Sequence, residues 1–96
     1  MSYTVRVVYS KPNDDVALHT PSAEYTNLIN SYFDAGKITS KPSYVTSGLT
    51  YTYTMVFNTV EDFQAFKLEP AAQANFTTRE TYCNTHSISY SLEHGV

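Results

Sequence analysis

Residues 49–57 read Leu-Thr-Tyr-Thr-Tyr-Thr-Met-Val-Phe, so larger side chains alternate with threonine or valine. Alternate side chains of a β-strand point to opposite faces of the sheet, whereas no helix would sort this segment into two sides. We therefore predict a strand with a core face made of Leu49, Tyr51, Tyr53, Met55 and Phe57. Its other face, made of Thr50, Thr52, Thr54 and Val56, is uncharged and is the surface from which most of the functional argument follows.

Three further strands are predicted. Residues 3–10 alternate as a first strand, and residues 86–92 form the last one, with Ile88, Tyr90 and Leu92 on the core side. A strand within residues 38–46 contains Pro42, which cannot donate to a neighbour, so we expect it at a sheet edge. Residues 47–48, Ser-Gly, are predicted as the hairpin turn that follows. A two-residue turn there would pair Tyr44 with Tyr51 and Ser43 with Thr52.

The first predicted helix begins with Thr20 as N-cap and Pro21 at its first position. Gly36 supplies the left-handed residue that ends it. Helical spacing places a complete apolar stripe on this helix, namely Tyr25, Leu28, Ile29, Tyr32 and Phe33.

The second helical region has two parts. Thr59 is predicted as the N-cap, and the first part stops near residues 67–69, because Pro70 cannot lie inside a helix. Pro70 starts the second part, which runs to about residue 82 with Ala74 and Tyr82 on its inner side. The complete order is β-α-β-β-α-β. This predicts a single α+β domain over residues 1–96 with the ferredoxin-like fold, a four-stranded antiparallel sheet with helices on one face.

Composition limits the function. The chain has 96 residues and a formal net charge of −3, and its six Lys and Arg residues form no stripe that would neutralise a phosphate backbone. No apolar run approaches the roughly 20 residues of a membrane helix, and the N-terminus lacks the pattern of a signal peptide. We therefore expect a cytoplasmic protein that binds neither nucleic acid nor membranes. The single cysteine, Cys83, excludes an internal disulfide.

Residues 57–62, Phe-Asn-Thr-Val-Glu-Asp, resemble the junction between the third strand and the second helix of RNA-recognition domains. Those domains stack bases on aromatic side chains of the open sheet face. Aligning on Phe57 places the two stacking positions at Thr52 and Thr54, so the resemblance concerns the fold, and RNA binding is not expected.

The length, the element order and the broken helical region at residues 62–73 resemble the dimeric α/β barrel group, which includes cofactor-free monooxygenases of the antibiotic-biosynthesis type. The resemblance implies a dimer packed through its sheets, or a substrate held between sheet and helices, and it carries over no catalytic residue. The composition also resembles that of small proteins of tailed bacteriophages, which would imply the host cytoplasm.

The number of tyrosines is unusually high for this length. There are nine, and eight of them fall at predicted core positions. Buried hydroxyl groups need hydrogen-bond partners. Either the rings surround a polar-lined pocket or each hydroxyl reaches water at the edge of the core. His19, beside the first helix, adds a group that titrates near neutrality. The candidate pocket residues are Tyr9, Tyr32, Tyr51, Tyr53, Tyr90 and His19. Cys83 and His86 alone make no metal site, and no metal or cofactor is expected.

Two functions follow from these patterns. The first is a non-catalytic module that forms a homodimer or a larger homo-oligomer through the open sheet face, where Arg6 is the only predicted charge. The interface candidates are Arg6, Val8, Thr50, Thr52, Thr54, Val56 and Ser89. The alternative is a small-molecule-binding protein, or a cofactor-free monooxygenase or isomerase of the dimeric α/β barrel type. An enclosed cavity of roughly 300 Å³ or more would favour that alternative.

Overall fold

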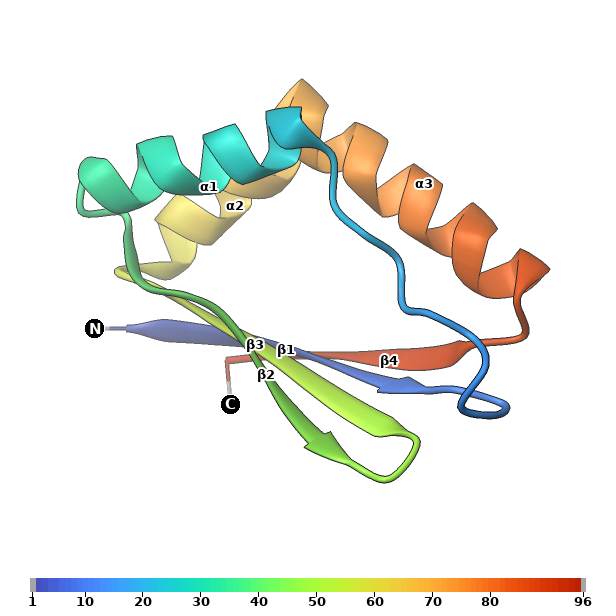
Figure 1. The fold of residues 1–96 in the computed structure, drawn as a ribbon. Helices are drawn as coiled ribbons and strands as arrows, with labels where there is room; N and C mark the ends of the chain where they lie inside the picture. Colours follow the sequence, from blue (N-terminus) through green and yellow to red (C-terminus); the bar gives the residue numbers. More distant parts are fainter. Residues whose placement is uncertain (1, 96) are drawn as a thin grey trace.

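The computed structural model describes residues 2–95. A four-stranded antiparallel sheet in the order β2-β3-β1-β4 carries all three helices on one face (Figure 1). This is the ferredoxin-like arrangement that the element order predicts. Along the chain the elements are β1 (Tyr3–Ser10), α1 (Ala23–Asp34), β2 (Ile38–Ser47), β3 (Thr50–Phe57), α2 (Val60–Leu68), α3 (Pro70–Thr85) and β4 (Ser89–His94).

The alternation in β3 sorts its side chains as predicted. Met55 and Phe57 are buried beneath the helices, and Val5, Val7 and Tyr9 of β1 are buried beside them. Antiparallel pairing places Val5 opposite Met55 and Val7 opposite Tyr53, so that core residues of neighbouring strands share one face. The threonines of β3 therefore lie on the opposite face, which no helix covers.

The β2–β3 hairpin differs from the prediction in its register. Ser47 pairs with Thr50, so the turn consists of Gly48 and Leu49, and Leu49 is not a strand residue. Gly48 has a positive φ of 59°, which glycine adopts without strain. Moving the turn by one position shifts the pairing by two residues. Because side chains alternate with a period of two, each strand keeps its faces despite this shift.

The corrected register changes the partners in β2. Tyr44 lies opposite Tyr53 rather than Tyr51, and Ser43 lies opposite Thr54 rather than Thr52. The strand forms one edge of the sheet, as predicted, and its pairing is irregular between residues 38 and 43, around Pro42. A proline lacks the N–H that a regular ladder needs, which accounts for this irregularity.

Helix α1 begins later than predicted. Its N-cap is Ser22, whose hydroxyl accepts a hydrogen bond from the Tyr25 N–H at 3.2 Å, so Thr20 and Pro21 precede the helix. The buried face carries Tyr25, Ile29 and Tyr32, whereas the predicted core residue Phe33 is 39% exposed at the edge of the stripe. Gly36, with φ of 78°, follows the helix as predicted.

The break between α2 and α3 is confirmed at Glu69, which has an extended backbone between the two helices. Thr59 caps α2 as predicted, with its hydroxyl accepting from the Asp62 N–H at 3.1 Å. Helix α3 continues to Thr85, so the last strand starts at Ser89 rather than His86 and extends to His94. Ala74 is exposed rather than inward-facing, because the buried face of α3 carries Ala72, Asn75 and Cys83.

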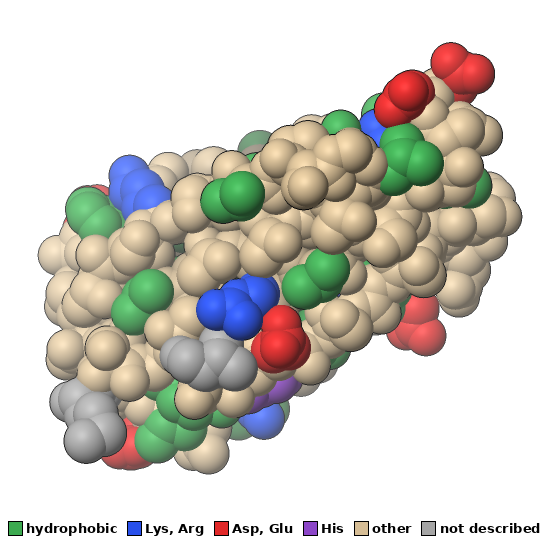
Figure 2. Space-filling model, turned by 90° about the horizontal axis from the view of Figure 1, so that it is seen from below, with side chains coloured by type: hydrophobic (Ala, Val, Ile, Leu, Met, Phe, Trp, Pro, Cys, Tyr) green, Lys and Arg blue, Asp and Glu red, His purple; other side chains and the backbone are tan. Residues whose placement is uncertain are grey.

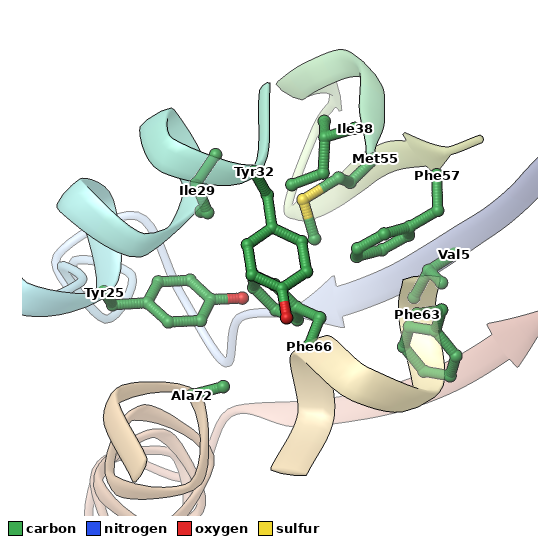
Figure 3. Close-up of a cluster of buried hydrophobic side chains, with 10 residues drawn as sticks. All are labelled: Val5, Tyr25, Ile29, Tyr32, Ile38, Met55, Phe57, Phe63, Phe66 and Ala72. Atoms are coloured by element: carbon green, nitrogen blue, oxygen red, sulfur yellow. The ribbon is translucent and has the colours of Figure 1, made fainter. Parts of the chain in front are cut away.

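The buried side chains form two separate clusters. The larger one lies under α1 and α2, where the rings of Tyr25 and Tyr32 both contact Phe66, at centroid distances of 5.7 and 5.2 Å (Figure 3). The smaller one lies under the C-terminal end of α3 and consists of Val7, Tyr9, Cys83 and Ile88. Tyr53 packs against both clusters. The candidate site lies between them.

Candidate functional site

A partly open cavity of about 360 Å³ lies between the sheet and helices α2 and α3. Helix α3 lies far from the sheet at its N-terminal end and close to it at its C-terminal end (Figure 1). Strand β4 is incompletely covered. Leu92 shows the consequence, because it points to the helix side and lines the cavity but is still 49% exposed. The walls are mainly apolar and aromatic, with Val5, Val7, Met55, Phe66 and Phe76 among them.

Arg79 is the charged group at the inner side of this cavity. Its guanidinium carbon lies 5.2 Å from the ring centroid of Phe76 and 5.1 Å from that of Tyr90, so the group makes cation–π contacts with two aromatic side chains. Its Nε atom is buried and has no hydrogen-bond partner. Within residues 2–95, the only ion pair joins Arg6 to Glu93, so no carboxylate side chain of this part compensates Arg79.

Tyrosine hydroxyl groups gather around Arg79 in a small polar chamber beside the cavity. The chamber is lined by Tyr9, Tyr25, Tyr44 and Tyr53, and Arg79, Tyr25 and Tyr53 also line the main cavity. Burial raises the pKa of Tyr9 to about 12, although the nearby guanidinium acts in the opposite direction. Burial also raises the pKa of Tyr53, and a contact with the Tyr25 hydroxyl adds to that effect. These phenols are therefore neutral hydrogen-bond donors at neutral pH.

Two further polar groups border the same chamber. Asn75 lies one helical turn before Arg79 and is 7% exposed, and its side-chain oxygen has no hydrogen-bond partner. His19 comes from the connection that precedes α1, and both burial and the charge of Arg79 lower its pKa. That connection is fixed by the Tyr82 hydroxyl, which donates to the Ala17 carbonyl at 2.7 Å.

The structure brings together four of the six predicted pocket residues. Tyr9, Tyr53 and His19 line the chamber, and Tyr90 stacks on Arg79. The other two lie elsewhere. The Tyr32 hydroxyl donates to Glu69 Oε2 at 3.0 Å, and the Tyr51 hydroxyl accepts from Lys11 Nζ at 3.4 Å.

Arg79 and Asn75 are the functional candidates that the sequence prediction missed. Their spacing contained the signal, because residues 72, 75, 79 and 83 follow helical periodicity and all face the interior. The prediction placed Ala74 on the inner side and therefore assigned the wrong face of this helix to the interior. With the correct phase, an arginine and an asparagine fall on an otherwise apolar helix face, and such residues need an explanation.

The opposite face of the sheet contains all the predicted interface residues. Half-buried Thr50, Thr52, Thr54 and Val56 lie in β3, and Val8 and Arg6 lie beside them in β1. Figure 2 shows this face as mostly uncharged polar surface with scattered apolar side chains. Ser89 lies on it at the start of β4.

Arg6 is not the only charge on that face, in contrast to the prediction. Arg6 Nη1 lies 3.6 Å from Glu93 Oε1, and the two residues are paired across β1 and β4. The prediction missed Glu93 because it ended the last strand at residue 92. The pair is largely exposed and therefore contributes little to stability.

Other chemistry finds little support in the described part of the chain. Among residues 2–95, no three His, Cys, Asp or Glu side chains are grouped as metal ligands would be. Cys83 is buried, and burial raises the pKa of its thiol, which disfavours the reactive thiolate. None of the described helices combines the length and the apolar character that crossing a membrane requires.

Comparisons with known proteins give a fold likeness alone. No protein-family model matches the chain, and no curated protein matches it. One similar solved structure is a dimeric protein of unknown function and ferredoxin-like fold from Bacteroides fragilis NCTC 9343. It is 15% identical, with a TM-score of 0.40, and the likeness covers 95% of this chain and 94% of that chain.

Proposed function

We propose that this domain binds a small, largely apolar molecule in the cavity between the sheet and helices α2 and α3. The observation that carries the proposal is the cavity itself, about 360 Å³ in a chain of 96 residues. The cavity is partly open rather than enclosed as the sequence argument required, but its walls are mainly apolar. Ligand sites typically measure about 300–1,000 Å³ and combine apolar walls with a few polar groups, as this cavity does.

The change of direction between α2 and α3 keeps the cavity open. The break at Glu69 and Pro70 lets α3 leave the line of α2, while Phe66 is held in the larger cluster and Cys83 in the smaller one. Both ends of the helical layer are therefore attached to the sheet, and the space between them stays open. Filling this space with a ligand would bury apolar surface that is now partly exposed, including Leu92, and burial of apolar surface is favourable.

Titration with cinnamamide tests the proposal. This probe is neutral and aromatic, and binding would be followed by methyl NMR shifts. We expect saturable binding, with the largest shifts at Val7, Met55 and Leu92. In the variant Leu92→Trp, the larger ring should fill the cavity and weaken binding about tenfold or more, as the loss of about 1.4 kcal/mol implies.

The matched control is Val45→Trp, which adds the same ring at a side chain that is 67% exposed on the opposite face of the sheet. Its affinity for cinnamamide should equal that of the unmodified protein. Absence of saturable binding to the unmodified protein, or equal loss in both variants, would contradict binding in this cavity.

Self-association through the open face is a second candidate function. The supporting observation is the open sheet face, on which Arg6 and Glu93 form the one ion pair found among residues 2–95. Exposed Val45 lies on this face, and the free edges of β2 and β4 flank it. Light scattering should then give about twice the protomer mass of 10.8 kDa. The variant Val8→Glu, which places a charge in the centre of this face, should give monomers, whereas Leu68→Glu on a helix should not. A monomer of the unmodified protein at high concentration would exclude this function.

A further inference from the structure

We propose that the ligand of the cavity carries a carboxylate group, and that Arg79 binds this group at the inner, polar end. The inference rests on the proposed binding function and adds the chemical class of the ligand, an apolar body that ends in a single carboxylate. The uncompensated guanidinium between the rings of Phe76 and Tyr90 carries the argument.

The first step concerns charge. A partly buried cation without a counter-ion is unfavourable, and proteins usually pair such groups. The titratable groups around the cavity, besides its tyrosines, are Arg79, Lys67, Glu80 and His94. The one carboxylate among them, Glu80, forms no ion pair with Arg79. Among residues 2–95, two permanent cations thus line the cavity beside one carboxylate, and this balance favours an incoming anion.

The second step concerns geometry. The rings of Phe76 and Tyr90 both lie against the guanidinium, and the Tyr9 hydroxyl is also close to it, so these contacts restrict how the group can be oriented. Its Nε atom is buried without a hydrogen-bond partner, so a ligand in the cavity would meet the two terminal nitrogens. A guanidinium edge matches the two oxygens of a carboxylate, with two parallel N–H···O bonds.

The third step concerns the remaining donors. Tyr25 and Tyr53 line both the cavity and the chamber, beside Arg79. Burial raises the pKa of both hydroxyl groups, so both stay protonated at neutral pH. A protonated phenol that lines the cavity can donate its O–H to a ligand. One guanidinium edge and one phenol suffice for a monoanionic carboxylate, whereas a phosphate dianion with three terminal oxygens requires more donors.

The experiment compares cinnamate with cinnamamide, which differ only in the carboxylate and amide groups. Calorimetric titrations at neutral pH give the ratio of the two dissociation constants. Octanoate and octanamide provide a second pair with an aliphatic body. For the unmodified protein we expect the carboxylate of at least one pair to bind about 10- to 100-fold more tightly than its amide, as charged hydrogen bonds imply.

Three variants locate the source of this preference. Arg79→Gln should reduce the ratio to about one while the amide still binds, which also shows that the cavity remains folded. Arg6→Gln changes the net charge equally but lies on the opposite face, and should keep the full ratio. Lys67→Gln, at the cavity wall, should keep most of it.

Three other results would overturn the inference. If carboxylate and amide bind the unmodified protein equally, the cavity binds ligands but not through an anion site, so only the carboxylate inference fails. If neither member of either pair binds, the proposed function fails as well. If Lys67→Gln abolishes the preference and Arg79→Gln preserves it, the carboxylate is not held by Arg79.

Discussion

Raising the pH from neutral to about 11 should weaken the fold measurably through Tyr9. This residue is 7% exposed, and burial raises the pKa of its hydroxyl from 10.0 to about 12. The folded state therefore holds the phenol proton more tightly than the unfolded chain does. The corresponding stability is fully present below about pH 10 and is lost as the pH rises through 10 toward 12.

The magnitude follows from the size of this shift. One pKa unit corresponds to about 1.4 kcal/mol, so the full shift of Tyr9 corresponds to about 2.7 kcal/mol. At about pH 11, halfway through the window, roughly half of it, about 1.4 kcal/mol, has been lost. Screening by solvent reduces this value, and we expect a loss of about 1 kcal/mol from Tyr9. Burial raises the pKa of Tyr25, Tyr44 and Tyr53 too, so the protein as a whole should lose more.

The assay is urea denaturation at about pH 7 and about pH 11 for the unmodified protein and for Tyr9→Phe. The variant lacks the titrating group, so its stability should fall by about 1 kcal/mol less between the two conditions. Val45→Ala, on the far side of the sheet, should show the same fall as the unmodified protein. Equal falls for Tyr9→Phe and the unmodified protein would refute the assignment of Tyr9 to a buried polar chamber.

Two further substitutions test the scaffold by urea denaturation. Thr59→Ala removes the hydroxyl that accepts from the Asp62 N–H at 3.1 Å, and should lower the free energy of unfolding by about 1 kcal/mol; an unchanged value would mean that Thr59 does not cap α2. Phe66→Ala truncates a side chain that is 1% exposed and meets two tyrosine rings, and should cost about 3–5 kcal/mol. A loss below about 1 kcal/mol would contradict the packing of the larger cluster.

The strand faces and the order of elements could be predicted because their signals are local. Alternation in residues 49–57 assigns each side chain to a face whatever the register, and Pro70 determines where α3 starts. The hairpin register was wrong because Gly48 can occupy either position of a two-residue turn, and the two choices differ by two residues in pairing. The start of α1 was wrong because Thr20 and Ser22 are both suitable N-caps on either side of Pro21.

The site could be predicted only in part. Tyrosines in a small core implied a polar region, and Tyr9, Tyr53 and Tyr90 do lie close to one another. The position of Arg79 depended on the phase of α3, which the weak apolar pattern of that helix did not determine. The cavity depends on the angle between α3 and the sheet, a property of tertiary packing that no local pattern encodes.

Nuclear Overhauser effects from bound cinnamate test the central claim most directly, because adjacent valines of β1 face opposite sides of the sheet. Val7 lines the cavity, whereas Val8 lies on the open face. Binding in the cavity predicts contacts from the cinnamate ring to the methyl groups of Val7, Met55 and Leu92. The contacts to Val7 and Met55 should weaken in Leu92→Trp. Contacts to Val8, Val45 and Val56 instead would place the ligand on the open face and contradict the account.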